Sequence, residues 1–366
     1  MKIAQVAPLV ESVPPRFYGG TERVVHYLTE ELVRQGHDVT LFASGDSLTA
    51  AELVPCGDTA LRSNPQVQDP LPHYMVMLEK VRRRAREFDM IHFHIDCLQF
   101  LLFREMSTRT VTTLHGRLDL PDLVPLYQEF DDMPLVSISR HLRRPMPDVR
   151  WAGNVYHGLP LDLYAISRPS DGGYVAFLGR ICPEKRVDRV IEIARRAGAK
   201  LRIAAKVDSV DQVYFERKIR PLLSHPLIEY LGEISEREKG AFLGGAKAML
   251  FPIDWPEPFG LVMIEAMACG TPVIAYPCGS VPEVVEHGVT GFIVENIDQA
   301  VAALGKLDTL DGGVIRRRFE RRFTVARMAR DYVKIYRALT EPERLPMQAV
   351  RTGLRAGTGV GVAFAD

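Results

Sequence analysis

Short runs of aliphatic residues alternate with amphipathic segments from the first residues of the chain onward. Residues 3–8 and 39–43 have the length and apolar content of strands, and residues 21–35 between them repeat apolar positions at helical spacing. Further strand candidates follow at residues 90–93, 110–114 and 135–138. Strands that alternate with helices indicate parallel strand-helix-strand units, so the first half predicts one doubly wound domain.

A second series of the same kind follows the polar, turn-rich stretch 167–173. Its predicted strands are residues 174–178, 201–205, 228–231, 248–252 and 272–275, and its predicted helices are residues 187–197, 212–223, 235–244 and 259–269. We therefore predict an α/β fold of two Rossmann-like parallel-sheet domains, at residues 1–166 and 172–321, that face each other across a cleft. A helix at about residues 322–340 is expected to pack back towards the first domain, and residues 346–366 to form a flexible tail.

Composition narrows the class of protein. The 366 residues carry 46 Lys and Arg against 46 Asp and Glu, so a general nucleic-acid binder, which needs a basic excess, is not predicted. The five cysteines lack a Cys-x-x-Cys pair, which indicates neither a disulfide framework nor a zinc site. The first residues do not read as a signal peptide, and no run approaches the roughly 18 apolar residues of a membrane span. We expect a cytoplasmic protein, and the sequence predicts no oligomeric state.

Two loops at predicted strand ends carry groups suited to a phosphate. Gly19-Gly20 lies between the first strand and its helix, where bare backbone and a helix N-terminus favour an anion; a plain turn is the alternative. Arg180 and Lys185 follow the first strand of the second domain, where they are able to direct two cations at one diphosphate. Solvated surface residues are the alternative for this pair.

The stretch from residue 251 to residue 272 is the most informative part of the chain. Prolines on both sides hold Glu257 in an extended segment, and a helix that starts near Phe259 points its free N–H groups into the cleft. Glu265 then lies about two turns into an apolar helix, where a buried carboxylate needs a hydrogen-bonding partner. Sugar or ribose hydroxyls would serve, and an ion pair with a neighbouring Lys or Arg is the alternative.

Histidines also cluster at predicted strand ends. His92, His94 and Asp96 alternate along one strand end, but we expect these side chains not to converge, so no metal site is predicted. His115 follows the strand at 110–114 and is a candidate hydrogen-bond donor to a ligand hydroxyl or phosphate, with a structural histidine as the alternative.

Three basic runs, at residues 82–86, 143–144 and 316–318, favour solvated helix faces because acidic residues accompany them. Weak peripheral contact with an anionic membrane is the alternative that they leave open.

These residues together resemble the family-4 retaining glycosyltransferases, which have the GT-B fold. The resemblance covers roughly residues 1–340 and rests on four elements: Tyr18-Gly19-Gly20-Thr21-Glu22, Gly179-Arg180 with Glu184-Lys185, the Glu-x7-Glu spacing of Glu257 and Glu265, and the segments 279–285 and 288–292. It implies a first domain on the acceptor side and a second domain that binds the nucleotide sugar.

The resemblance also implies a role for each candidate residue. Gly19 and Gly20 would lie against the donor phosphate, and Arg180 and Lys185 would hold the diphosphate and stabilise the leaving nucleotide. Glu257 would contact the donor sugar, Glu265 would bind the ribose, and His115 would lie near the reacting centre. The backbone contacts to the donor would come from Phe259, Gly260 and Leu261.

The implied reaction moves a hexosyl unit from a UDP- or GDP-linked sugar to a hydroxyl acceptor, with retention and without a metal or other cofactor. The acceptor would be a small molecule, a glycan or a lipid-linked molecule. A sugar-nucleotide epimerase of the same fold and a non-catalytic nucleotide-sugar binding module are the alternatives.

Two departures from the family pattern stand near the expected cleft. Tyr156-His157-Gly158 takes the place where many relatives have Asn-Gly, and Ala204-Ala205-Lys206 replaces a strand end that more often contains glycine.

Overall fold

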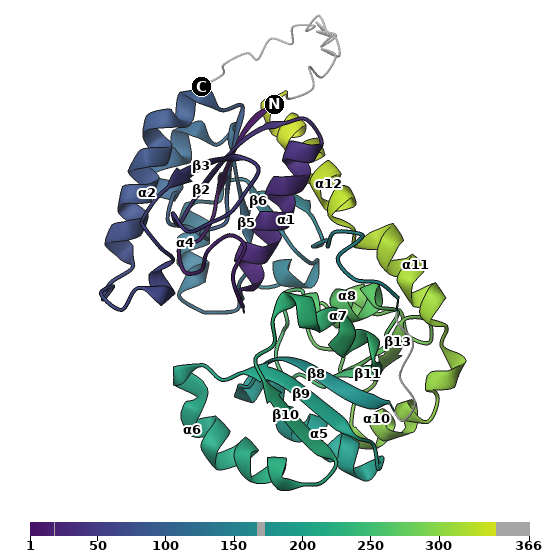
Figure 1. Ribbon diagram of the computed structural model, residues 1–366. Helices are drawn as coiled ribbons and strands as arrows, with labels where there is room; N and C mark the ends of the chain where they lie inside the picture. The colour runs from purple at the N-terminus through teal and green to yellow at the C-terminus, as the bar shows by residue number, and fades with distance from the viewer. Residues whose placement is uncertain (18, 167–172, 342–366) are drawn as a thin grey trace, which may run out of the picture.

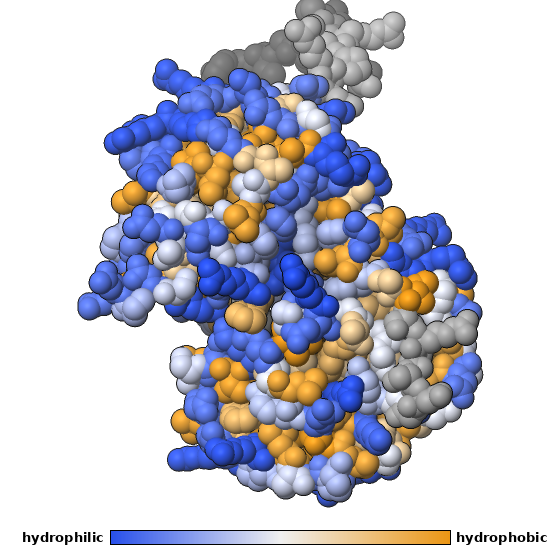
Figure 2. All heavy atoms as spheres, in the orientation of Figure 1, coloured by the Kyte–Doolittle hydropathy of each residue, from blue (hydrophilic) through white to orange (hydrophobic). Residues whose placement is uncertain are grey.

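The computed structural model describes residues 1–17, 19–166 and 173–341, and every structural statement below concerns those ranges. Tyr18, most of the stretch 167–173 and the expected tail at 346–366 lie outside them. Figure 1 shows two lobes, each built around one sheet, with the last two helices running along one side of both. In Figure 2 hydrophilic side chains cover much of the surface of both lobes, and apolar residues lie among these hydrophilic side chains.

The first sheet has seven parallel strands in the order β3-β2-β1-β4-β5-β6-β7. Its strands are β1 (Lys2–Val6), β2 (Asp38–Ala43), β3 (Glu52–Pro55), β4 (Met90–Phe93), β5 (Thr110–Leu114), β6 (Leu135–Ser137) and β7 (Trp151–Asn154). The strand order reverses between β1 and β4, so the loops after these two strands diverge and leave a crevice at their carboxyl ends.

The second sheet repeats this plan with six parallel strands in the order β10-β9-β8-β11-β12-β13. Its strands are β8 (Tyr174–Arg180), β9 (Leu201–Lys206), β10 (Ile228–Gly232), β11 (Ala246–Phe251), β12 (Val273–Ala275) and β13 (Gly291–Ile293). The order here reverses between β8 and β11. The prediction of two doubly wound parallel sheets is confirmed.

Helices cover both sheets, and short 3-10 turns join several of them. The α-helices are α1 (Gly20–Arg34), α2 (Leu71–Arg84), α3 (Phe100–Phe103), α4 (Leu123–Glu129), α5 (Val187–Arg196), α6 (Gln212–Tyr214), α7 (Glu236–Gly244), α8 (Leu261–Ala268), α9 (Val281–Val284), α10 (Ile297–Leu304), α11 (Gly312–Arg322) and α12 (Val325–Thr340). The helix expected at 212–223 is not regular: α6 passes into a π-helical turn at Phe215–Ile219 and then a 3-10 turn that contains Pro221. Proline cannot donate the backbone hydrogen bond that a regular helix needs there.

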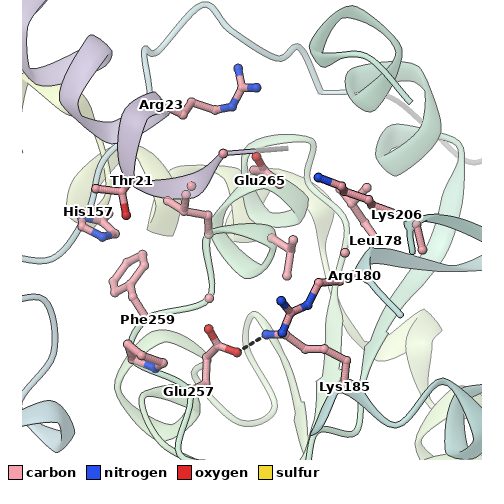
Figure 3. A pocket seen from close by; sticks show the side chains of 18 of the residues that line it. Thr21, Arg23, His157, Leu178, Arg180, Lys185, Lys206, Glu257, Phe259 and Glu265 are labelled. Carbon is pink, nitrogen blue, oxygen red and sulfur yellow. Dashed lines mark hydrogen bonds and ion pairs between the residues drawn. The ribbon is translucent and has the colours of Figure 1, made fainter. Parts of the chain in front are cut away.

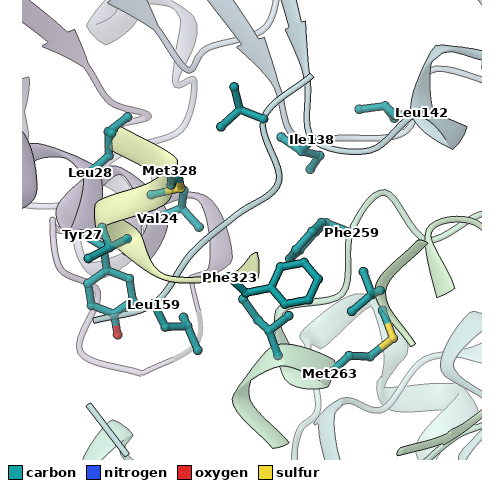
Figure 4. Packing of buried hydrophobic residues seen from close by; sticks show 14 of the residues in the cluster. Val24, Tyr27, Leu28, Ile138, Leu142, Leu159, Phe259, Met263, Phe323 and Met328 are labelled. Carbon is teal, nitrogen blue, oxygen red and sulfur yellow. The ribbon is translucent and has the colours of Figure 1, made fainter. Parts of the chain in front are cut away.

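The two lobes share one apolar cluster, which Figure 4 shows around Phe259 and Phe323. Leu159 lies in the segment that leaves the first lobe, and its backbone exchanges hydrogen bonds of 2.9 and 2.8 Å with Phe323 and Val325 in the segment that returns. The returning chain then forms α12, which packs on α1 and β7 of the first lobe. The two segments that cross between the lobes are therefore paired at Leu159, which is itself buried.

One residue of the basic runs does not lie on a solvated face. Arg316 on α11 is buried, and its guanidinium donates hydrogen bonds of 2.6 Å to the carbonyl oxygens of Leu161, Tyr164 and Ala268. The expectation is wrong for this residue because the arginine satisfies carbonyls at the end of α8 and in the crossover. No helix in the described ranges is long and apolar enough to cross a membrane.

Candidate active site

A cleft of about 320 Å³ lies between the lobes, where the carboxyl ends of both sheets meet. Much of its lining comes from the ends of β1 and β5 in the first sheet and of β8 and β11 in the second, and β1, β8 and β11 are strands at which the strand order reverses. All ten residues predicted for the site line this cleft: Gly19, Gly20, His115, Arg180, Lys185, Glu257, Phe259, Gly260, Leu261 and Glu265. Residues from distant parts of the sequence are therefore brought to one place by the topology alone.

Lys185 and Glu257 form an ion pair at the centre of the second-lobe wall, drawn as the dashed line in Figure 3. Lys185 lies on a 3-10 turn after β8, and its Nζ is about 5 Å from the ring centroids of Phe251 (5.2 Å) and Trp255 (5.0 Å). Trp255 Nε1 also donates to Glu257 Oε2, at 3.0 Å. Because both bonds fall on Oε2, Oε1 makes no hydrogen bond within the described residues and stays available to a ligand.

The loop before α9 clamps the Glu257 segment in place. Gly279 has φ +62, and a Cβ there would lie 2.2 Å from Glu257 N, so only glycine allows this approach. Ser280 then donates from its backbone to Glu257 O and from its hydroxyl to Phe259 O, at 2.9 and 2.8 Å. Glu257 is consequently fixed by its backbone as well as by Lys185.

Helix α8 presents a positive end to the cleft. Its N-cap is Gly260, whose φ of +75 turns the chain sharply from the extended segment into the helix. The amides of Gly260, Leu261 and Val262 have no hydrogen-bond acceptor within the described residues. A helix N-terminus with free N–H groups stabilises an anion, so this end of α8 suits a phosphate.

Across the cleft, the start of α1 comes close to the start of α8. A Cβ built on Gly20 would lie 3.7 Å from Leu261 Cδ1, whereas one on Gly19 would lie 2.7 Å from Pro15. Gly19 is therefore needed for the packing of its own loop, and Gly20 is the glycine that faces the opposite lobe.

Arg180, at the end of β8, lines the cleft beside Lys185, but two carboxylates already surround it. Its guanidinium lies 3.4 Å from Asp208 and 3.6 Å from Asp211, and Asp208 also pairs with Lys206 at 3.0 Å. Lys206 thus adds a further cation to the lining, beside Arg180 and Lys185.

Glu265 belongs to a buried chain of charges that joins the lobes. It is 2% exposed, and its Oε1 accepts a hydrogen bond from Lys239 Nζ at 2.9 Å. Lys239 also pairs with Glu236 at 3.1 Å, and Glu236 pairs with Arg23 of α1 at 2.8 Å. Burial alone would lower the pKa of Lys239, but Glu265 and Glu236 outweigh it and raise that pKa. The ion-pair alternative for Glu265 is therefore realised, yet its Oε2 is buried without a hydrogen-bond partner in the described part of the chain.

Two other histidines contact the ring of His115. Its Nε2 lies 2.9 Å from His94 Nδ1, and its ring stacks on His157 at 5.3 Å, with His157 in turn edge-on to Phe259. Burial lowers the pKa of His115 to about 3, so the ring is neutral near pH 7.

The expectation that His92 and His94 do not converge is wrong. Residues two apart on a strand share a face, and their ring centroids on β4 are 4.0 Å apart. Both nitrogens of His92 are bonded, to Tyr336 Oη and Thr113 Oγ1, each at 2.7 Å. The ranges covered by the structure contain no group of three or more His, Cys, Asp or Glu side chains placed to hold a metal ion.

Several further residues of the cleft were not singled out from the sequence as site residues. Among them are Arg23, His157, Lys239 and Trp255. Trp255 and Arg23 adjoin motifs that were identified, so proximity was an available signal. Lys239 had none, because nothing in α7 indicates that it meets Glu265 of α8.

Two facing Rossmann-like lobes, with cations, carboxylates and a helix N-terminus at the crevice between them, define a glycosyltransferase of the GT-B class. Residues 18–154 match the protein-family model described as Glycosyltransferase Family 4. Residues 165–321 match the protein-family model described as Glycosyl transferases group 1. The chain therefore belongs to glycosyltransferase family 4, and it is an enzyme of the transferase class.

Proteins with similar sequences are also named glycosyltransferases. The chain is 26% identical over 341 residues to an uncharacterized glycosyltransferase of Methanocaldococcus jannaschii, a match that covers 80% of this chain and 85% of the relative. It is 34% identical over 165 residues to the D-inositol 3-phosphate glycosyltransferase of Mycobacterium leprae, but that match covers 41% of this chain and 36% of that enzyme.

Solved structures show the same fold. Sucrose-phosphate synthase from Thermosynechococcus elongatus superposes with a TM-score of 0.73 at 18% identity, covering 93% of this chain and 99% of that one. HepE of Anabaena, solved in complex with UDP and glucose, superposes with a TM-score of 0.69 at 19% identity, covering 91% and 98%.

Proposed function

We propose that this glycosyltransferase transfers a hexosyl unit, with retention of configuration, from a UDP- or GDP-linked sugar to a hydroxyl group, and that it needs no metal. The acceptor is a small molecule, a glycan or a lipid-linked molecule. The observation that carries the proposal is the meeting of Lys185, Arg180 and the N-terminus of α8 around Glu257 in one cleft.

The charges in the cleft suit the departure of a nucleoside diphosphate. Negative charge builds on the diphosphate as the bond to the sugar breaks, and cations held in fixed positions stabilise it without reorganisation. Lys185 is fixed by Glu257 and two aromatic rings, and the free amides of α8 add a helix dipole. These groups supply the positive charge that a divalent metal supplies in other enzymes.

The carboxylates suit hydroxyl groups of the donor. Glu257 Oε1 is available to a sugar hydroxyl, and the unpartnered Glu265 Oε2 is able to accept from a ribose hydroxyl. Binding of UDP to HepE and the name of the mycobacterial relative support a nucleotide-sugar donor here by likeness.

Incubation of the protein with UDP- and GDP-hexoses and a panel of hydroxyl acceptors tests the proposal. We expect release of nucleoside diphosphate that depends on an acceptor, continues with excess EDTA, and yields a product with the anomeric configuration of the donor. Isomerised donor without acceptor would indicate an epimerase instead, and saturable binding without any turnover would indicate a binding module.

Substitution of Glu265 by glutamine tests the ribose contact. We expect Glu265→Gln to weaken the binding of UDP or GDP roughly tenfold, because a charged acceptor is lost from a hydrogen bond to the ribose. Lys239 keeps Glu236 as its partner in this variant, so the fold should hold. Titration calorimetry measures the effect, with Glu295→Gln, a change at an exposed carboxylate, as the matched control. Equal affinity in the two variants would remove Glu265 from the donor site.

A further inference from the structure

A continuous line of buried hydrogen bonds runs from α12 to the cleft. Its members, in order, are Tyr332, Thr113, His92, Tyr336, Gln5, His94 and His115. The side chains before His115 come from α12, β1, β5 and the end of β4, and all of them are buried. The catalytic reaction gives these inner residues no direct task, since only His115 among them lines the cleft.

The direction of each hydrogen bond along this line follows from the contacts of Tyr336. Its Oη lies 2.7 Å from His92 Nδ1 but 3.3 Å from the amide group of Gln5. A phenol is a strong donor, and its one proton serves the closer acceptor, so Tyr336 donates to His92 and accepts from Gln5 Nε2. Gln5 Oε1 then faces His94 Nε2, at 2.8 Å, and accepts a proton that this nitrogen must carry.

The nitrogen that carries the proton in His94 determines which nitrogen carries it in His115. A neutral imidazole carries a proton on one nitrogen only, and burial lowers the pKa of both His94 and His115, which keeps both rings neutral. With Nε2 of His94 protonated, its Nδ1 is an acceptor, and His115 Nε2 must donate to it across 2.9 Å. His115 Nδ1 is left without a proton, and it has no hydrogen-bond partner in the described residues.

We propose that Gln5, acting through His94, fixes the tautomer of His115 so that its Nδ1 is a hydrogen-bond acceptor for a substrate hydroxyl. Gln5 and His94 are thus positioning residues, and Tyr336 of α12 holds Gln5 in its orientation. This inference rests on the proposed function in one respect, namely that a sugar or acceptor hydroxyl lies beside His115. It replaces the sequence-based expectation that His115 acts as a donor.

The tautomer of His115 is measured without substrate, so a failure of this proposal is distinguishable from a failure of the proposed function. Long-range 1H–15N spectra of the protein with 15N-labelled histidine distinguish a protonated from an unprotonated ring nitrogen, and single His→Asn variants assign the signals. We expect both His94 and His115 to carry the proton on Nε2. A proton on His115 Nδ1 in the unsubstituted protein would overturn the proposal, whatever the enzyme transfers.

Substitution of Gln5 tests its part in the chain. Gln5→Met keeps the shape but removes both hydrogen bonds, so we expect the His115 signals to shift towards a mixture of tautomers. Gln5→Glu keeps an acceptor for His94, and we expect it to restore the Nε2 tautomer. An unchanged His115 spectrum in Gln5→Met would overturn the role of Gln5.

Kinetics of the same variants supply a second readout. With the donor identified by nucleotide release, we expect Gln5→Met to lower kcat/KM roughly three- to tenfold, the effect of one hydrogen bond, and Gln5→Glu to recover most of it. Gln66→Met, at an exposed glutamine of the same lobe, is the matched control. Equal kcat/KM in Gln5→Met and Gln66→Met would show that the tautomer has no bearing on the reaction.

Discussion

Replacement of Lys185 by alanine is expected to lower kcat roughly 100- to 1000-fold, the usual cost of removing one group that stabilises charge in the transition state. The cleft holds Lys185 between Glu257 and the rings of Phe251 and Trp255. Its loss leaves the departing diphosphate with Arg180, which two aspartates already partly neutralise, and with the amides of α8. Release of nucleoside diphosphate, followed by a coupled assay, measures the change.

The matched control is Lys247→Ala, which removes an exposed lysine of β11 in the same lobe. Glu257 keeps its bond from Trp255 and its backbone clamp in Lys185→Ala, so circular dichroism should show an unchanged fold. Activity of Lys185→Ala within threefold of the control would show that this lysine does not stabilise the leaving group.

The plan of the fold was predictable because parallel sheets require continuous apolar strands. Residues 90–93 and 110–114 were predicted as strands with the bounds that β4 and β5 have. Three strands at sheet edges were not predicted from the sequence: β3 (Glu52–Pro55), β7 (Trp151–Asn154) and β13 (Gly291–Ile293). The first two are partly exposed, so their sequences lack the continuous apolar run, and β13 has only three residues.

The site was predictable where a charged or polar residue follows the end of a predicted strand or precedes a predicted helix. Arg180, Glu257 and His115 were identified in this way, and the structure places all three on one cleft. Partners that come from another element were not predictable. The pairing of Lys239 with Glu265 and the burial of Arg316 depend on how helices pack, and one sequence does not contain that information.

Acid is expected to destabilise this protein steeply, because three buried histidines and the half-buried His115 must stay neutral in the folded state. Burial lowers the pKa of His92, His94, His115 and His157, whereas an unfolded histidine titrates near 6.5. The unfolded chain thus binds more protons below that pH, and the stability that is present above it is lost as the pH falls. Each neutral histidine lowers the free energy of unfolding by up to about 1.4 kcal/mol per pH unit.

The four histidines together would lower the free energy of unfolding by about 5 kcal/mol between pH 7 and pH 5.5. That change is comparable to the whole stability of many proteins. Urea unfolding at a series of pH values measures the slope. His157→Asn removes the imidazole and should reduce the slope by about a quarter, since one of four titrating groups is gone. Gln66→Met, at an exposed glutamine that carries no titratable group, should leave the slope unchanged. A slope equal in all three proteins would mean that His157 binds its proton equally well in the folded and unfolded states, against its burial beside Phe259.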